Sequence, residues 1–255
     1  MLNENFSKIF GELPILGMIH LAGDGPTDKV DRALEELAIF EKEGVDGAII
    51  ENYHGRVDDV ERTLKEIDKA NTKVVMGINI LSNEFDLAFR LAKKYGAKFI
   101  QLDYIAGKYT SGELPVSSYM RYKQEHPDVV VLGGVWPKYY HPVNGSNLEA
   151  DLIEGMKRAE AIVVTGKGTG KETPFDKIKS FRKSIGKHPL IVGAGLNPEN
   201  AYEQLSIADG AIVGSSLKIG YETENAVDKD QVRDLMKVVR KVRAEHSYVR
   251  NLFNY

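Results

Sequence analysis

Eight short apolar runs recur along the chain, and their starts are 20 to 32 residues apart. Most of them are apolar throughout instead of alternating with polar residues, which suits parallel strands that are buried on both faces. The sequence therefore predicts eight strands, at residues 15–20, 47–53, 74–81, 99–105, 129–136, 161–166, 190–196 and 210–217.

Amphipathic stretches separate these runs. Their apolar residues recur at spacings of three and four, which places one apolar stripe on each helix. Gly44, Gly96 and Gly186 stand where helices should end, and Asn197 followed by Pro198 is typical of a helix start. Residues 107–118 are polar and predict a loop before a short helix at 119–125. The clearest stripes run through Val30, Leu34 and Leu37, through Val57, Val60, Leu64 and Ile67, through Phe85, Phe89 and Ala92, through Ile178, Phe181 and Ile185, and through Val232, Leu235, Val239 and Val242.

A strand and a helix repeated eight times indicate an α/β fold of the (β/α)8 class, the TIM barrel. The length of 255 residues agrees with the roughly 250 residues of one such barrel. No linker divides the chain, so we predict a single domain over residues 1–255, with a lead-in at 1–14 and a tail at 246–255. The tail should pack on the barrel or on a second subunit of a homo-oligomer, since it carries Tyr248, Leu252, Phe253 and Tyr255.

Composition narrows the class of protein. A net charge of -3 offers no electrostatic case for a nucleic-acid partner. The absence of cysteine excludes disulfides, thiolate zinc sites, iron–sulfur clusters and a cysteine nucleophile. The polar start and the lack of an apolar run near 20 residues predict neither a signal peptide nor a membrane span. A cytoplasmic location is the expectation.

The last two apolar runs break into small residues. In (β/α)8 barrels the loops after strands seven and eight commonly bind phosphate. Glycine allows backbone amides to approach an anion closely, and a helix N-terminus adds a positive dipole end. The alternative is that the glycines only make room for tight turns. We predict a small phosphorylated partner bound by Gly193, Ala194, Gly195, Gly214, Ser215 and Ser216.

Polar residues gather at the ends of the other strands, where active sites of this fold lie. Glu51 and Asp103 are the candidate general acid and base, since two carboxyl groups at one mouth suit proton transfer. Lys138 is a candidate for stabilising an oxyanion, and His20 for catalysis or ligand contact. Strand four also offers Gln101. In the alternative interpretation, the carboxylates pair with lysines and Lys138 is a solvated loop residue.

Five further residues are predicted to bind substrate. Lys167 lies in Thr165-Gly-Lys-Gly-Thr-Gly170, a segment that lacks P-loop spacing but can fold over an anion or form a flexible turn. Trp136 can stack on a planar ligand or pack in the core. No cofactor is predicted. A divalent metal held by His20, Glu51 and Asp103 is the alternative, although no local ligand spacing supports it. The substrate-binding candidates are Asn52, Asn79, Trp136, Thr165 and Lys167.

Seven segments, spread from the first predicted strand to the last, match the motifs of a known family. They are Gly17-Met-Ile-His-Leu21, Val45-Asp-Gly-Ala-Ile-Ile-Glu-Asn52, Gly77-Ile-Asn-Ile-Leu81, Val163-Val-Thr-Gly166, Val192-Gly-Ala-Gly195, Pro198-Glu-Asn200 and Ala208-Asp-Gly-Ala-Ile-Val-Gly-Ser-Ser-Leu-Lys218. With these segments the chain resembles the BtpA/SgcQ family of TIM-barrel proteins. The resemblance implies a fold similar to ribulose-phosphate-binding barrels, which include epimerases, isomerases and lyases of phosphorylated sugars. It implies no established reaction, and the family is named for a cyanobacterial factor linked to photosystem I biogenesis.

The chain departs from the family pattern at two places. The loop Ala22-Gly-Asp-Gly-Pro26 is shorter and more acidic than the family's, and Gly134 and Trp136 stand where the family has Asp and His, while Lys138 keeps its place. We expect an enzyme of isomerase, epimerase or lyase type that acts on a small phosphorylated sugar or nucleotide-derived metabolite. The alternatives are a non-catalytic biogenesis or assembly factor and a phosphosugar-binding regulatory protein, because acid–base groups after strand five are replaced.

Overall fold

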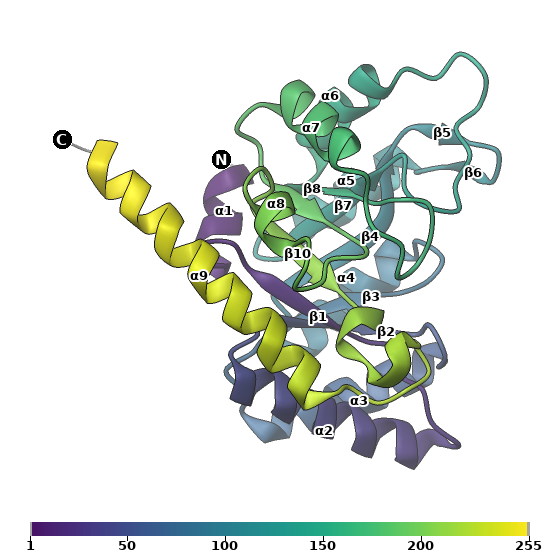
Figure 1. Ribbon diagram of the computed structural model, residues 1–255. Coiled ribbons are helices and arrows are strands. Elements are labelled where there is room, and N and C mark those ends of the chain that lie inside the picture. The colour runs from purple at the N-terminus through teal and green to yellow at the C-terminus, as the bar shows by residue number, and fades with distance from the viewer. Residues whose placement is uncertain (1, 254–255) are drawn as a thin grey trace.

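Eight parallel strands close into a barrel in the computed structural model, which describes the backbone of residues 2–253 and the side chains of residues 4–246 (Figure 1). The last barrel strand pairs with the first, so the (β/α)8 prediction is confirmed. In chain order the barrel strands are β1 (Ile15–Ile19), β2 (Gly47–Glu51), β3 (Val75–Asn79), β4 (Phe99–Ala106), β7 (Val130–Val135), β8 (Ala161–Val164), β9 (Leu190–Val192) and β10 (Gly210–Val213).

A helix follows each barrel strand. Gly44 and Gly96 end their helices in the left-handed conformation, as expected of glycine C-caps. The predicted start at Asn197 and Pro198 is early, because the Asn197 side chain caps a turn and the helix begins at Ala201. The helices are α2 (Pro26–Glu43), α3 (Val57–Ala70), α4 (Phe85–Tyr95), α5 (Val116–Glu125), α6 (Leu148–Arg158), α7 (Phe175–Ile185), α8 (Ala201–Leu205) and α9 (Lys229–Phe253).

Burial on both faces explains the continuous apolar runs, since every residue of β1, β2 and β7 to β10 is buried. The lead-in contains a helix that the sequence did not predict, α1 (Leu2–Ile9). Phe6 and Phe10 join the core cluster inside the barrel, and the Phe10 and Phe99 rings meet edge to face with centroids 5.1 Å apart. This helix therefore covers the N-terminal end of the barrel and leaves the opposite end for a site.

Short elements follow two of the barrel strands at their C-terminal ends. The polar segment after β4 forms a small hairpin of β5 (Lys108–Tyr109) and β6 (Gly112–Glu113), and two 3-10 turns, η1 (Ser215–Leu217) and η2 (Ile219–Tyr221), follow β10.

The last helix, α9, has a backbone that extends past the barrel body (Figure 1). The predicted packing of Tyr248, Leu252, Phe253 and Tyr255 lies outside the described side chains. No helix within the described residues is long and apolar enough to cross a membrane.

Candidate active site

A cavity of about 400 Å³ opens at the C-terminal ends of the barrel strands. Strand ends from all around the barrel contribute to its lining, as expected of an active site in this fold. The structure therefore brings together most of the residues that were predicted from the sequence. Those that line the cavity are His20, Glu51, Asp103, Lys138, Thr165, Gly193, Ala194, Gly195, Gly214, Ser215 and Ser216.

A row of polar residues crosses the neighbouring strands β1 to β4. Glu51 and Asn79 are register partners on β2 and β3, and the pairing of Ile78 with Ile100 sets Asn79 beside Gln101 on β4. His20 completes the row, with its Nε2 3.8 Å from Glu51 Oε2. Side chains in one lateral row of a parallel sheet point to the same face of the sheet. Here that face is the inside of the barrel, at the end where the cavity opens.

Glu51 is a buried carboxyl group within this row. Asn79 Nδ2 donates a hydrogen bond of 2.7 Å to Glu51 Oε1. Burial, reinforced by the negative charge of Asp103, raises the pKa of Glu51 to about 8, although Lys138 and the Asn79 bond oppose the rise. Near neutral pH, Glu51 is therefore mainly protonated and can donate a proton.

Asp103 lies two residues after Gln101 on β4 and faces the same cavity. Tyr140 OH donates a 2.7 Å hydrogen bond to Asp103 Oδ2. Burial raises the pKa of Asp103, while the Tyr140 bond and the charge of Lys138 hold the rise back. Because Asp103 and Glu51 interact, they titrate as a pair, and the arrangement favours a state in which one of them holds a proton and the other accepts one.

Lys138 enters the site from the loop after β7. Its backbone amide donates to Thr165 Oγ1 over 2.8 Å, and its Nζ donates to Thr169 Oγ1 over 3.1 Å. Thr169 also bonds with Tyr139, whose hydroxyl accepts from the Thr169 amide at 2.9 Å. Neither Thr169 nor Tyr139 is among the site residues predicted from the sequence. These bonds hold the glycine-rich loop 165–170 against the loop after β7, beside the cavity.

Four predicted site residues do not line the cavity. The Trp136 indole donates to Asp151 Oδ2 at 2.8 Å, which fastens its loop to α6. Asn52 Oδ1 accepts from the Leu81 amide at 2.8 Å and so supports the loop after β3. Asn79 is fully buried but holds Glu51. Lys167 is exposed on the loop 165–170 and does not line the cavity.

The two glycine-rich loops border the cavity, yet their glycines have packing reasons as well. The Gly193 amide already donates to Val164 O at 2.8 Å. A Cβ at Gly193 would come within 2.5 Å of Val163, and one at Gly195, where φ is +73°, would come within 2.4 Å of backbone atoms of the segment that follows loop 165–170. The Ser216 hydroxyl joins the two loops by donating to Leu196 O at 2.6 Å. The glycines are therefore required by the packing of these loops, while Ala194, Gly195, Ser215 and Ser216 also line the cavity.

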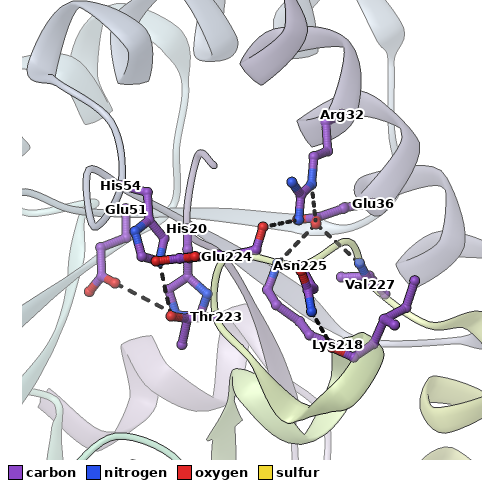
Figure 2. A network of polar contacts seen from close by, with 11 residues as sticks. His20, Arg32, Glu36, Glu51, His54, Lys218, Thr223, Glu224, Asn225 and Val227 are labelled. Carbon is purple, nitrogen blue, oxygen red and sulfur yellow. Dashed lines mark hydrogen bonds and ion pairs between the residues drawn. The ribbon is translucent and has the colours of Figure 1, made fainter. Parts of the chain in front are cut away.

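The loop that follows η1 is fastened to α2 by a buried ion pair (Figure 2). Lys218 and Val227 form an antiparallel bridge at the base of this loop. Both bind the same oxygen of Glu36, since Lys218 Nζ is 2.9 Å and the Val227 amide 3.2 Å from Glu36 Oε1. Lys218 and Glu36 are each almost fully buried, so the pair fixes the chain directly after the second glycine-rich loop.

The same loop reaches the end of β2. The His54 and Thr223 side chains face each other (Figure 2), and the distance between His54 Nε2 and Thr223 Oγ1 is 2.9 Å. His20 is buried nearby, and burial together with the positive charge of Lys218 holds the pKa of His20 well below its usual value. His20 is therefore neutral near pH 7 and can accept or donate a hydrogen bond. Within the described residues, no three histidine, aspartate or glutamate side chains are grouped to hold a metal ion.

Comparisons with known proteins agree with this architecture. Residues 12–241 match the model of the BtpA family. The chain belongs to the BtpA family. It is 30% identical over 259 residues to an uncharacterized protein of Pyrococcus horikoshii, covering 92% of this chain and 98% of that protein. It is 28% identical over 244 residues to the photosystem I biogenesis protein BtpA of Synechocystis, covering 86% and 85%.

Solved structures share the barrel of this BtpA family member. Phosphoribosyl anthranilate isomerase from Thermus thermophilus has a TM-score of 0.63 at 16% identity, covering 91% of this chain and 100% of the isomerase. A native KDPGal structure also has a TM-score of 0.63 at 16% identity, covering 92% and 98%. At this identity the likeness shows the fold alone.

Proposed function

We propose that the protein is an enzyme that moves a proton within a small phosphorylated sugar or nucleotide-derived metabolite, as an isomerase, epimerase or lyase does. The observation that carries the proposal is the pair formed by buried Glu51 and half-buried Asp103, whose carboxyl groups both face the cavity and both have raised pKa values. Paired titratable groups with raised pKa values in a cleft are typical of acid–base sites.

The two carboxyl groups take different roles because they differ in protonation state. Asp103, in its ionised form, takes a proton from the carbon beside a carbonyl group of the substrate. Glu51, which is mainly protonated near neutral pH, gives a proton to the carbonyl oxygen as the electrons move onto it. The Lys138 ammonium stabilises the negative charge that develops on that oxygen. Neutral His20 orients a hydroxyl group, and Asn79 holds Glu51 in place.

The phosphate is proposed to lie beside Ala194, Gly195, Ser215 and Ser216, on the β9 and β10 side of the mouth. The ring order of the strands sets β9 across from β3 and β10 across from β4. A substrate held there by its phosphate extends over the cavity toward Glu51 and Asp103. A small-molecule partner and a cytoplasmic location belong to the same proposal.

Two measurements test the function before the substrate is identified. The first is a thermal-shift screen of phosphorylated sugars and nucleotides beside their dephosphorylated counterparts, since a ligand at 100 times its Kd adds about 2.7 kcal/mol of stability. The second is NMR of each binding compound in D2O, where proton abstraction exchanges a carbon-bound hydrogen for deuterium. Binding limited to phosphorylated compounds, followed by exchange, supports the enzyme.

A second candidate is a non-catalytic factor, which the name of the Synechocystis relative favours. Binding without any deuterium exchange would point to a phosphosugar-binding regulatory protein. The absence of binding across the panel would reject the phosphosugar enzyme and favour an assembly factor with a protein partner.

A further inference from the structure

The floor of the cavity contains a carboxamide that the fold does not use. Gln101 lines the cavity on β4, and its Oε1 is shielded from solvent without a hydrogen-bond partner among the described residues. The neighbouring Asn79 directs its Nδ2 to Glu51, while its Oδ1 is likewise buried and unpaired within the described part of the chain. An unpaired buried polar atom destabilises the folded state, so these amides are arranged at the expense of stability.

Gln101 lies on the side of the barrel opposite the proposed phosphate site. β4, which carries Gln101, lies across the barrel from β10 and its loop at Ser215 and Ser216. The residues beside Gln101 in the cavity include Asp103, and Glu51 is two strands away in the same row. A ligand end that reaches Gln101 is therefore close to the Glu51–Asp103 pair, whose ionised member, Asp103 in the proposed mechanism, repels a second anionic group.

We propose that Gln101 is a specificity-determining residue that binds an uncharged hydroxyl group at the end of the substrate opposite the phosphate. A hydroxyl group can donate to the amide oxygen or accept from the amide nitrogen, so it satisfies Gln101 in either orientation. The substrate class is then a neutral sugar monophosphate, and phosphorylated sugar acids are excluded. This inference rests on the proposed function, because it assumes that the phosphate lies at β9 and β10.

The test compares matched ligands on matched variants. The ligands are glucose 6-phosphate, 6-phosphogluconate, ribose 5-phosphate, 5-phosphoribonate and inorganic phosphate, with Kd values measured by calorimetry. The variants are Gln101→Leu and Gln101→Met, which keep the bulk of the side chain, and Gln124→Leu as control, since Gln124 lies on α5 away from the cavity. For the wild type we expect at least one neutral sugar phosphate to bind about tenfold or more tightly than its acid counterpart.

The variants separate a role in specificity from a structural role. Both Gln101 variants should bind that neutral sugar phosphate with a Kd about tenfold higher than the wild type. Their Kd for inorganic phosphate should be unchanged. The free variants should melt at or above the temperature of the wild type, because no hydrogen bond of the fold is lost. A structural residue would instead lower the melting temperature of both variants, and this result would overturn the inference.

The remaining outcomes distinguish the two proposals. Equal or tighter binding of the sugar acids, or unchanged affinity in both Gln101 variants, would overturn the role of Gln101 and leave the proposed function standing. The absence of binding by every phosphorylated compound to the wild type would overturn the proposed function and this inference together.

Discussion

The two halves of the barrel mouth are built from different residues. The half formed by β1 to β4 presents carboxyl and amide side chains, including Glu51 and Asp103, whereas the half formed by β7 to β10 contributes many glycine, alanine and serine residues, together with Lys138. A glycine stands at each seam where the halves meet. A Cβ at Gly134 would lie 2.0 Å from Asp103 O, and one at Gly214 would lie 3.0 Å from the His20 ring.

The glycines of the small half therefore make space for residues of the polar half. This also explains a departure from the family pattern. The register between β4 and β7 shifts between Leu102 and Ala106, and the displaced Asp103 carbonyl occupies the space that a side chain at position 134 would need. The placement of Asp103 and the presence of Gly134 are thus linked, so the position of a carboxyl group on one half depends on a glycine on the other.

The largest effect that would break the comparison is the loss of the carboxyl pair. Asp103→Asn and Glu51→Gln should each slow deuterium exchange into the substrate by about 10²- to 10⁴-fold, the usual range for a general acid or base. The Kd of the same phosphorylated ligand should change little, because the small half still binds the phosphate. NMR exchange rates and calorimetry measure the two quantities, with Glu125→Gln as an exposed control. Undiminished exchange in both variants would remove the acid–base assignment.

The next effect concerns the ion pair behind the small half. Glu36→Gln should lower the free energy of unfolding by about 3–5 kcal/mol, because it leaves the buried Lys218 charge without its partner. Chemical denaturation measures the change. Exposed Glu66, paired with Lys69, offers a control, and Glu66→Gln should cost less than about 1 kcal/mol. Similar losses in the two variants would show that the buried pair has no special role.

The seam between β4 and β7 gives a smaller effect. Gly134→Ala should destabilise the fold by about 1–3 kcal/mol, since the new methyl group forces the Asp103 backbone to move. The displaced Asp103 should also slow deuterium exchange. Gly11→Ala is the matched control, because a Cβ at Gly11 meets nothing within 4 Å. Full stability and full exchange in Gly134→Ala would contradict the link between the two halves.

The strands and the carboxyl groups at their ends could be predicted from the sequence, whereas the contacts at these seams could not. The strands were predictable because continuous apolar runs report burial on both faces, and Glu51 and Asp103 followed from their place at strand ends. From the sequence, Gly134 indicated only the loss of an acidic residue, because a single chain does not reveal that another strand's carbonyl fills the space. The hydrogen bond from Tyr140 to Asp103 and the ion pair of Lys218 with Glu36 join residues that are far apart in the sequence. No local sequence pattern therefore predicts them.

The polar half also makes stability depend on pH. Counted per pH unit, this is the smallest predicted effect, a change of about 1 kcal/mol in the free energy of unfolding. The folded-state pKa of Glu51 is raised to about 8, above the roughly 4.3 of an unfolded glutamate. Between these values the folded state holds a proton that the unfolded state has released, so this residue makes stability fall as the pH rises from about 5 to 8. Glu51→Gln removes that contribution, so the stability of the variant should gain on that of the wild type with each pH unit in this range. Denaturation midpoints of both proteins at pH 5, 6, 7 and 8 measure the difference, in which the other titrating groups largely cancel. Parallel curves would mean that Glu51 ionises normally, and the proton donor of the polar half would then have to be Asp103.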